Sequence, residues 1–235
     1  MILGLVGSRA YRAIVIEQPA QSLTDLALGI VVVTLAVQLR RAPTIHRHWL
    51  ASFWWAGIAA LAGAIHHGVV VRWARPAEIS WAAISVLVVV AVSYLLAATV
   101  LEVLGPGQAR VFWLLRSIGL VAYLGAAVSG HAGVTTMLMC ESLTMLSVLG
   151  LWGRAALHGH PLARPVLLAI LASGGAAGMK AISPDVTGLV GLDPTSAYHL
   201  AQIVGMVLLY RAISRRVVDP AEEARADRLL VPPVT

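Results

Sequence analysis

The sequence is poor in charged residues and in cysteine, and both shortages narrow what it can be. Only 12% of its 235 residues are Asp, Glu, Lys or Arg, whereas 59% are hydrophobic. A water-soluble domain with an apolar core and a polar shell is hard to build from that composition. The single cysteine, Cys140, excludes an intrachain disulfide and any cysteine-based metal site. Because it lies in an apolar run, we expect it to be a small buried hydrophobic residue.

The start of the chain lacks the pattern of a cleaved secretory signal. Arg9 and Arg12 follow the short apolar stretch 1–7 instead of preceding it, so we expect the N-terminus to remain on the mature protein. The formal net charge of +6 does not indicate a nucleic-acid partner, because the arginines lie mainly between apolar runs, where topology determinants and lipid contacts are found. Membrane lipids are the expected partners.

Seven mostly apolar stretches predict an all-α integral membrane protein, a bundle of seven transmembrane helices. Each has about 16 to 25 residues, close to what a helix needs to cross the bilayer. They cover residues 22–39, 49–71, 80–104, 111–130, 132–153, 165–180 and 195–213. The fourth and fifth stretches are separated by so few residues that a tight antiparallel hairpin is expected, and the sixth is the shortest.

The distribution of arginine predicts the orientation. The first, third and fifth loops and the exit of the last helix carry arginines, including Arg41, Arg110, Arg154 and Arg215, whereas the alternate loops are poorer in them. The positive-inside rule then places the N-terminus outside and the C-terminus in the cytoplasm, although Arg9 and Arg12 oppose this mildly. We expect residues 1–216 to form the transmembrane domain of a bacterial plasma (inner) membrane protein and residues 217–235 a short, partly disordered cytoplasmic tail.

In this topology, polar residues converge at the outer end of the bundle. His66 and His67 come late in the second helix, His199 comes early in the seventh, and Asp25 lies in the first turn of the first. Intramembrane ionisable residues are costly and usually functional. Other polar residues expected at this end are Glu78, His131, Lys180, Asp185, Asp193, Tyr198 and Gln202.

His66 and His67 cannot both face one metal ion, because adjacent helical side chains point about 100° apart. His66 shares a stripe with Ala59 and Ala62, and His67 shares one with Gly63. The small-residue stripe favours His66, slightly, as the ligand. The alternative for each histidine is an interhelical hydrogen bond.

Glu141 is expected near the bilayer centre, with no Lys or Arg at matching depth. It must therefore be protonated, hydrogen-bonded or turned toward a cavity, and the polar residues Thr135, Thr136, Ser142 and Thr144 favour a cavity. Glu102 and Arg116, in the inner half, are expected to form an ion pair or to reach the headgroups.

Two stretches, residues 57–66 and 193–199, resemble the second and seventh helices of the CREST superfamily of seven-helix membrane hydrolases, which includes alkaline ceramidases and the adiponectin and progestin receptors. The Thr24-Asp25 pair also looks like the Ser-Asn pair on helix 1 of the ceramidases. In that superfamily, one histidine on helix 2 and two on helix 7 bind zinc. The resemblance implies His66 and His199 as zinc ligands.

The match to the superfamily pattern is incomplete. Thr195 stands where the first helix 7 histidine belongs, and Ala62 where a serine belongs. Catalytic zinc usually has three protein ligands and a water, so Asp25, Glu78, His67 or Gln202 would complete the site, and Asp25 is the best candidate because carboxylate oxygen is a normal zinc ligand.

The resemblance implies a zinc-dependent hydrolase of a lipid amide or ester, in which Asp25 or Glu78 acts as general base toward a metal-activated water. Three alternatives remain open. The polar pocket of His67, Thr195, Tyr198 and Gln202 could bind a lipid or small molecule without catalysis. A proton-coupled transporter would use Glu141 and His199, although no inverted repeat is evident. Haem between facing histidines is the third.

Overall fold

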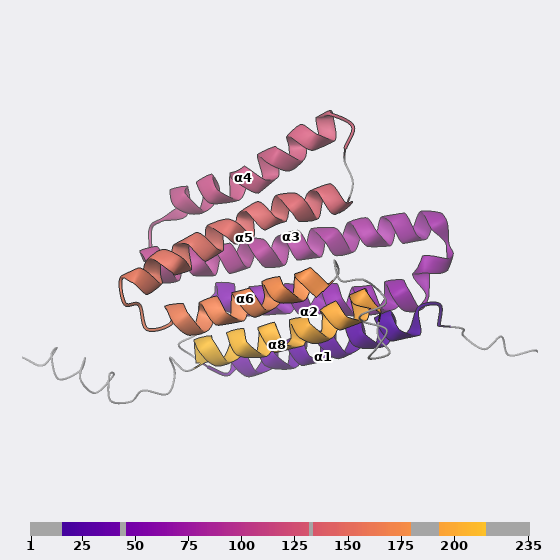
Figure 1. The fold of residues 1–235 in the computed structure, drawn as a ribbon, viewed down its shortest axis with the longest axis horizontal. Coiled ribbons are helices and arrows are strands. Elements are labelled where there is room, and N and C mark those ends of the chain that lie inside the picture. The colour runs from indigo at the N-terminus through magenta and orange to yellow at the C-terminus, as the bar shows by residue number, and fades with distance from the viewer. Residues whose placement is uncertain (1–15, 43–45, 132–133, 180–192, 215–235) are drawn as a thin grey trace, which may run out of the picture.

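The computed structural model describes residues 16–42, 46–131, 134–179 and 193–214, and every regular element in these ranges is a helix (Figure 1). The α-helices are α1 (Pro19–Arg40), α2 (Arg47–Gly68), α3 (Ala74–Leu104), α4 (Ala109–Val128), α5 (Val134–Leu157), α6 (Ala163–Met179) and α8 (Pro194–Ser214). A single 3-10 turn, η1 (Val70–Arg72), follows α2. The expected all-helical class is therefore confirmed for the described residues. The tail 217–235, Lys180 and Asp185 lie outside them.

Local sequence explains where several helices begin and end. Proline is tolerated in the first turn of a helix because its missing N–H would have no partner there, and α1 and α8 begin at Pro19 and Pro194. The His46 side chain caps α2 by accepting a hydrogen bond from the His48 amide at 3.3 Å. Gly105 ends α3 with a φ of 84°, a conformation that glycine adopts without strain.

Within the described ranges, four helices are long and apolar enough to cross a membrane. These segments are Pro19–Arg40, Arg47–Gly68, Ala74–Leu104 and Ala109–Ala126. A fifth apolar segment, Ala163–Ala176 in α6, is shorter. With 17 residues, α6 is the shortest α-helix in the described part of the chain, as expected. The composition and these helices together indicate a membrane protein.

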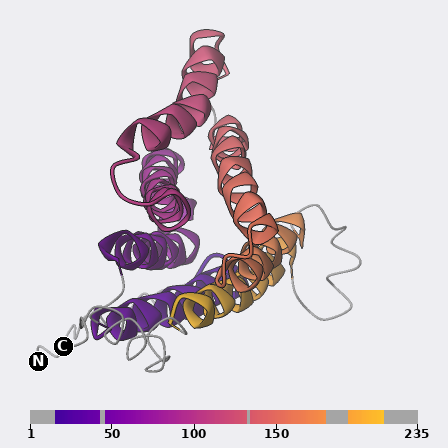
Figure 2. The ribbon, with the colours of Figure 1, turned by 90° about the vertical axis from the view of Figure 1, so that its left-hand side faces the viewer.

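The helices pack along one common direction (Figures 1 and 2). α1 lies against α2 and α8, α8 against α6, and α2 against α3, while α5 contacts α3, α4 and α6. Buried apolar side chains join these helices, and the largest of those that are fully buried are Trp152, Phe53, Leu39, Leu96, Val32, Val148 and Val166. Inside this core, Trp152 Nε1 donates a hydrogen bond of 3.1 Å to Thr99 Oγ1, which offsets the cost of burying both polar groups.

α4 is the most peripheral helix and forms the expected antiparallel hairpin with α5 (Figure 1). Only 11% of its most apolar segment is buried inside the protein, against 44% of the corresponding segment in each of α1, α2 and α3. The side chains of Trp113, Leu114, Val121 and Leu124 are all more than 60% exposed. Such a surface suits contact with lipid or with another protein chain.

Several helix boundaries differ by a few residues from those expected, and the start of α3 differs by the most. α3 begins at Ala74 rather than at residue 80, so Glu78 lies within α3 instead of preceding it. Its 31 residues exceed the thickness of the hydrocarbon region, and hydropathy alone marks only the apolar part of such a helix. α2 ends at Gly68, and the apolar residues 70 and 71 belong to η1.

The contact between α1 and α2 is close because glycines lie at several points along the interface, on both helices. A Cβ built on Gly29 of α1 would lie 2.6 Å from Leu61 Cδ2, and one built on Gly57 of α2 would lie 2.7 Å from Val33 Cγ2. The same antiparallel register continues toward the N-terminal end of α1, where Gly63 faces Asp25 and Gly68 faces Ser22. Small residues allow this approach of helix backbones in membranes.

We expect Gly29→Ala to lower the free energy of unfolding by about 1 to 3 kcal/mol, the usual cost of overpacking, because the new methyl group meets the Leu61 side chain and backbone. The matched control is Gly150→Ala in α5, where a Cβ meets no atom within 4 Å among the described residues. Alanine there should be neutral or stabilise by up to about 1 kcal/mol. Unfolding in mixed detergent micelles measures both, and equal effects would contradict the close α1–α2 contact.

Candidate functional site

Asp25 is the centre of the candidate site. It lies in the second turn of α1 and is only 5% exposed. Its carboxylate occupies the space above Gly63 of α2, where a Cβ would lie 2.5 Å from Oδ2. A residue larger than glycine at position 63 would displace the carboxylate. The α1–α2 contact thus determines where this acidic group stands.

His67 approaches Asp25 from α2, one turn beyond Gly63. Its Nε2 lies 3.7 Å from Asp25 Oδ2, and its Nδ1 lies 2.6 Å from Gln18 Oε1. The chain before α1 is held in place as well, because the Gln18 amide donates to the His67 carbonyl at 3.1 Å. An amide oxygen only accepts hydrogen bonds, so the Nδ1 of His67 carries a proton.

His199 approaches Asp25 from α8. Its Nε2 lies 3.2 Å from Asp25 Oδ1, and its Nδ1 lies 3.1 Å from Thr24 Oγ1. The Thr24 hydroxyl is placed to donate to the Ala20 carbonyl at 2.9 Å. With its hydrogen on that carbonyl, the Thr24 oxygen accepts from the Nδ1 of His199, and with its hydrogen turned to the ring it donates to a bare Nδ1.

The start of α8 is tied down by Asp193, which fixes the level of His199. Asp193 Oδ1 accepts hydrogen bonds from the amides of Thr195 and Ser196 at 2.9 and 3.1 Å. It also accepts one of 3.3 Å from Gln21 Nε2 of α1. Burial raises the pKa of Asp193, but the hydrogen bonds from Ser196, Thr195 and Gln21 lower it by more, so the net pKa lies below the ordinary value. Asp193 is therefore a charged helix cap at neutral pH.

These hydrogen bonds give the cluster of Asp25, His67 and His199 a defined chemistry. If both rings are neutral and protonated on Nδ1, each turns an Nε2 lone pair toward a carboxylate oxygen, which is a repulsive arrangement. A proton or a cation between nitrogen and oxygen removes the repulsion. In metal sites, ligating histidines likewise donate their other N–H to an oxygen acceptor.

His66 takes a different position from the one expected. It stacks on Trp81 of α3, with ring centroids 5.0 Å apart and an interplanar angle of 24°, and meets His67 edge-on at 5.1 Å. Its Nδ1 is buried and has no hydrogen-bond partner in the described part of the chain. The structure therefore brings His67 rather than His66 next to Asp25, because the face of α2 toward α1 is the one that carries Gly63 and His67.

The remaining residues proposed from the sequence are placed as follows. Tyr198 packs against the His199 ring, with centroids 5.3 Å apart. Gln202 Nε2 donates to Ser173 Oγ of α6 at 3.3 Å and so joins α8 to α6. The Thr195 amide caps α8 through Asp193. Glu78 is exposed on α3, and His131 is exposed beyond α4.

Glu141 does not belong to this cluster. Its Oε1 lies 2.8 Å from Arg116 Nη2 of α4, and Arg116 Nη1 donates to Thr144 Oγ1 at 3.0 Å. The expectation that no Lys or Arg matches the depth of Glu141 was wrong. Arg116 is 2% exposed and Glu141 6%. The long side chain of Arg116 reaches the carboxylate across the α4–α5 hairpin, which a depth estimate from sequence does not foresee.

A metal ion would require a small rearrangement of the cluster. No group of three or more His, Cys, Asp or Glu side chains among the described residues is placed to hold a metal as it stands. The rings of His67 and His199 have centroids 6.3 Å apart, whereas two imidazoles on one tetrahedral zinc ion would be about 5 Å apart. The donor types suit zinc, but the rings would have to approach by roughly 1 Å.

Residues 20–217 match the model of a family described as "Family of unknown function (DUF6962)", and the chain belongs to this family. No curated protein matches the chain, and no solved structure does. The matched range contains Asp25, His67 and His199 together with all the described helices except the first residue of α1.

The Arg116–Glu141 pair predicts a specific mutational pattern. Arg116→Met alone should lower the free energy of unfolding by about 3 to 5 kcal/mol, because it leaves a buried carboxylate without its counter-ion. Arg116→Met combined with Glu141→Leu should recover most of that loss, since an apolar pair avoids the desolvation cost. Unfolding in detergent micelles measures both. A double variant as unstable as the single one would show that the pair is not what stabilises this hairpin.

Proposed function

We propose that this member of the DUF6962 family is a seven-span integral membrane protein with its N-terminus outside and its C-terminus in the cytoplasm. Support comes from the four long apolar helices and from the arginine-rich loops after the first, third and fifth predicted spans. In this orientation the Asp25 cluster lies near the outer surface. The N-terminal ends of α1, α3 and α8 and the C-terminal end of α2 share that end of the bundle (Figure 1).

For the site, we propose that His67, His199 and Asp25 bind one divalent metal ion, with zinc as the best match to two imidazoles and a carboxylate. The observation that carries this proposal is the orientation of the two rings. Gln18 and Thr24 engage their Nδ1 atoms, so both Nε2 atoms are directed at one buried carboxylate. A cation there would also offset the charge of the buried carboxylate.

The chemistry proposed for the site is hydrolysis of a lipid amide or ester. Bound zinc would supply Lewis acidity and lower the pKa of a bound water. Among the chain's own groups, His67 and His199 hold the site, Gln18 and Thr24 orient their rings, and the second oxygen of Asp25 can accept a proton. The substrate class rests on the resemblance of residues 57–66 and 193–199 to membrane hydrolases.

A second candidate function follows from the same geometry. Asp25 joins two imidazoles that are themselves hydrogen-bonded to Gln18 and Thr24, which makes a continuous chain of groups able to hold and pass a proton. One proton shared between Asp25 and His199 would make the buried cluster neutral. A proton-binding site of this kind is the alternative to a metal site.

The orientation is tested by labelling cysteines from outside in a Cys140→Ala background. We expect His131→Cys to be modified and Arg41→Cys to be spared in sealed vesicles or cells. Both positions are exposed, and they follow the C-terminal ends of α4 and α1, which lie at opposite ends of the bundle in Figure 1. Permeabilised cells provide the control that both cysteines react. The reverse pattern would invert the topology and place the Asp25 cluster at the cytoplasmic side.

The metal site is tested by the zinc content of purified protein after dialysis against zinc. We expect about one equivalent in the natural sequence, a loss of binding in His67→Ala and His199→Ala, and a roughly 10- to 100-fold weaker affinity in Gln18→Ala, as for other groups that orient a ligand. His66→Ala should retain zinc, and His131→Ala is the matched exposed control.

Each other outcome has a defined meaning. Loss of zinc in His66→Ala but not in His67→Ala would overturn the ligand assignment. Zinc content near zero in the natural sequence would overturn the metal site. The proton-binding alternative then predicts that the proton uptake of the purified protein near neutral pH is reduced by His199→Ala.

A further inference from the structure

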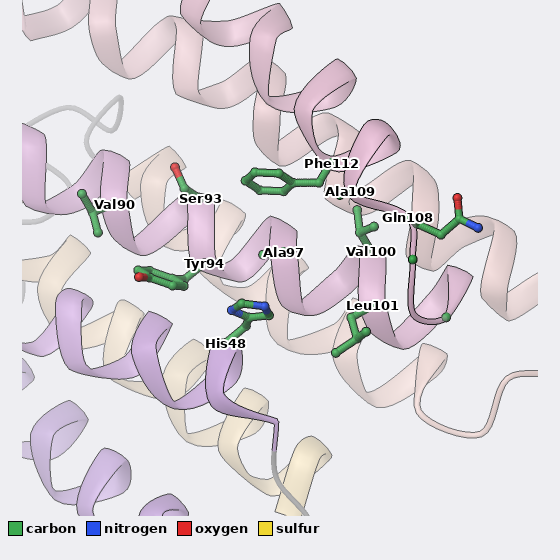
Figure 3. Close-up of a pocket in the computed structure, with 12 residues that line it drawn as sticks. His48, Val90, Ser93, Tyr94, Ala97, Val100, Leu101, Gln108, Ala109 and Phe112 are labelled. Atoms are coloured by element: carbon green, nitrogen blue, oxygen red, sulfur yellow. The ribbon is translucent and has the colours of Figure 1, made fainter.

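A cavity of about 510 Å³ lies at the inner end of the bundle, between the start of α2, the second half of α3 and the start of α4. Figure 3 shows Phe112 of α4 on one wall and His48 of α2 on the opposite one, with Ser93, Tyr94 and Ala97 of α3 between them. Its volume is in the range of small-molecule sites, roughly 300 to 1,000 Å³.

The cavity is separate from the Asp25 cluster. His48 is the second residue of α2, whereas His67 is the last but one. At the usual rise per residue, these positions are about 28 Å apart along the helix. The two sites therefore lie at opposite ends of the same helix, and a ligand of ordinary size in one does not reach the other.

The lining of the cavity suits an amphiphilic molecule. Most of the wall is apolar, with Val90, Ala97, Val100 and Phe112 contributing to it. Polar groups come from His48, Ser93, Tyr94 and Gln108. The Nδ1 of His48 is buried and lacks a hydrogen-bond partner within the described residues, and an unpaired buried polar atom is costly. A ligand with a polar end could supply that partner.

The surroundings indicate what kind of amphiphile is available. α3 and α4 are both apolar enough to span a membrane, and α4 is largely exposed, so a space between them opens among lipids. Arg47 and Arg110 are exposed, and in the sequence they stand next to the lining residues His48 and Ala109. Basic pockets between transmembrane helices on the cytoplasmic side bind anionic headgroups.

We propose that this cavity holds one acyl chain of an anionic phospholipid, with the lipid phosphate at Arg47 and Arg110. The acyl chain lies between Ala97 and Phe112, and the polar region of the lipid meets His48 and Gln108. This proposal rests on the membrane insertion proposed above, but it does not depend on the metal site.

The experiment measures lipid bound to the intact protein in detergent by native mass spectrometry, with phosphatidylglycerol as the anionic probe and phosphatidylcholine as the zwitterionic one. We expect one phosphatidylglycerol to bind with clear preference. Ala97→Trp should abolish binding by filling the cavity. Arg47→Gln with Arg110→Gln should weaken it roughly tenfold to thirtyfold, given about 1 kcal/mol for each basic residue.

Two controls keep the test specific. Ala82→Trp adds the same side chain to an exposed position of α3, and Arg40→Gln removes an exposed arginine at the inner end of α1. Neither should change lipid binding. Equal binding by Ala97→Trp and Ala82→Trp would overturn the cavity as the site, and equal binding of the two lipids would overturn the anionic headgroup.

Zinc content in the same preparations reports on the Asp25 cluster independently. A protein that binds the lipid without zinc would leave this inference standing while the metal site fails, and the converse holds as well. Failure of membrane insertion would appear in the cysteine labelling instead, so the three proposals can fail separately.

Discussion

The close antiparallel contact between α1 and α2 is the constraint on which the candidate site depends. Glycines at positions 29, 57, 63 and 68 remove the side chains that would otherwise hold the two helices apart. Because Gly63 has no Cβ, the Asp25 carboxylate can lie directly against α2, one turn from His67. α8 then adds His199 to the other oxygen of the same carboxylate. A wider spacing of α1 and α2 would leave Asp25 without this position between two imidazoles.

The two buried carboxylates of the described residues have neighbours of different kinds. Glu141 faces Arg116, whose guanidinium stays protonated at any physiological pH, so that pair is a fixed structural link between α4 and α5. Asp25 faces two imidazoles, a type of side chain that can take up or release a proton and can also bind metals. The same apolar surroundings thus contain one permanent charge pair and one cluster able to exchange a proton or a cation. Only the second has the chemistry expected of a functional site.

Much of the helical organisation follows from hydropathy. All seven apolar stretches overlap the α-helices of the structure, and the α4–α5 hairpin appears where few residues separate two stretches. The start of α3 could not be predicted from hydropathy. Residues 74 to 79 belong to the helix, but they include charged and exposed positions that an apolar stretch leaves out. The convergence of Asp25, His67 and His199 on one end is likewise foreseeable from the order and direction of the helices.

The supporting groups are harder to foresee. Gln18 precedes the first apolar stretch, and Trp81 has no polar pattern that marks it, yet both contact the histidines of α2. A signal for His67 was present, since Gly63 stands one turn before it and glycine marks a face of close helix approach. Gly119 likewise marks a close approach of two helices. It packs against the α5 backbone near Thr144, beside the Arg116–Glu141 pair.

The sequence by itself determined the helical class, the approximate limits of the helices and the end of the bundle at which the polar residues gather, because these depend on hydropathy and chain order alone. Only the tertiary structure decided that His67 rather than His66 meets Asp25 and that Arg116 reaches Glu141. Those pairings depend on the rotation of each helix about its axis. Adjacent residues differ by about 100° in direction, and only packing against a neighbouring helix fixes that angle.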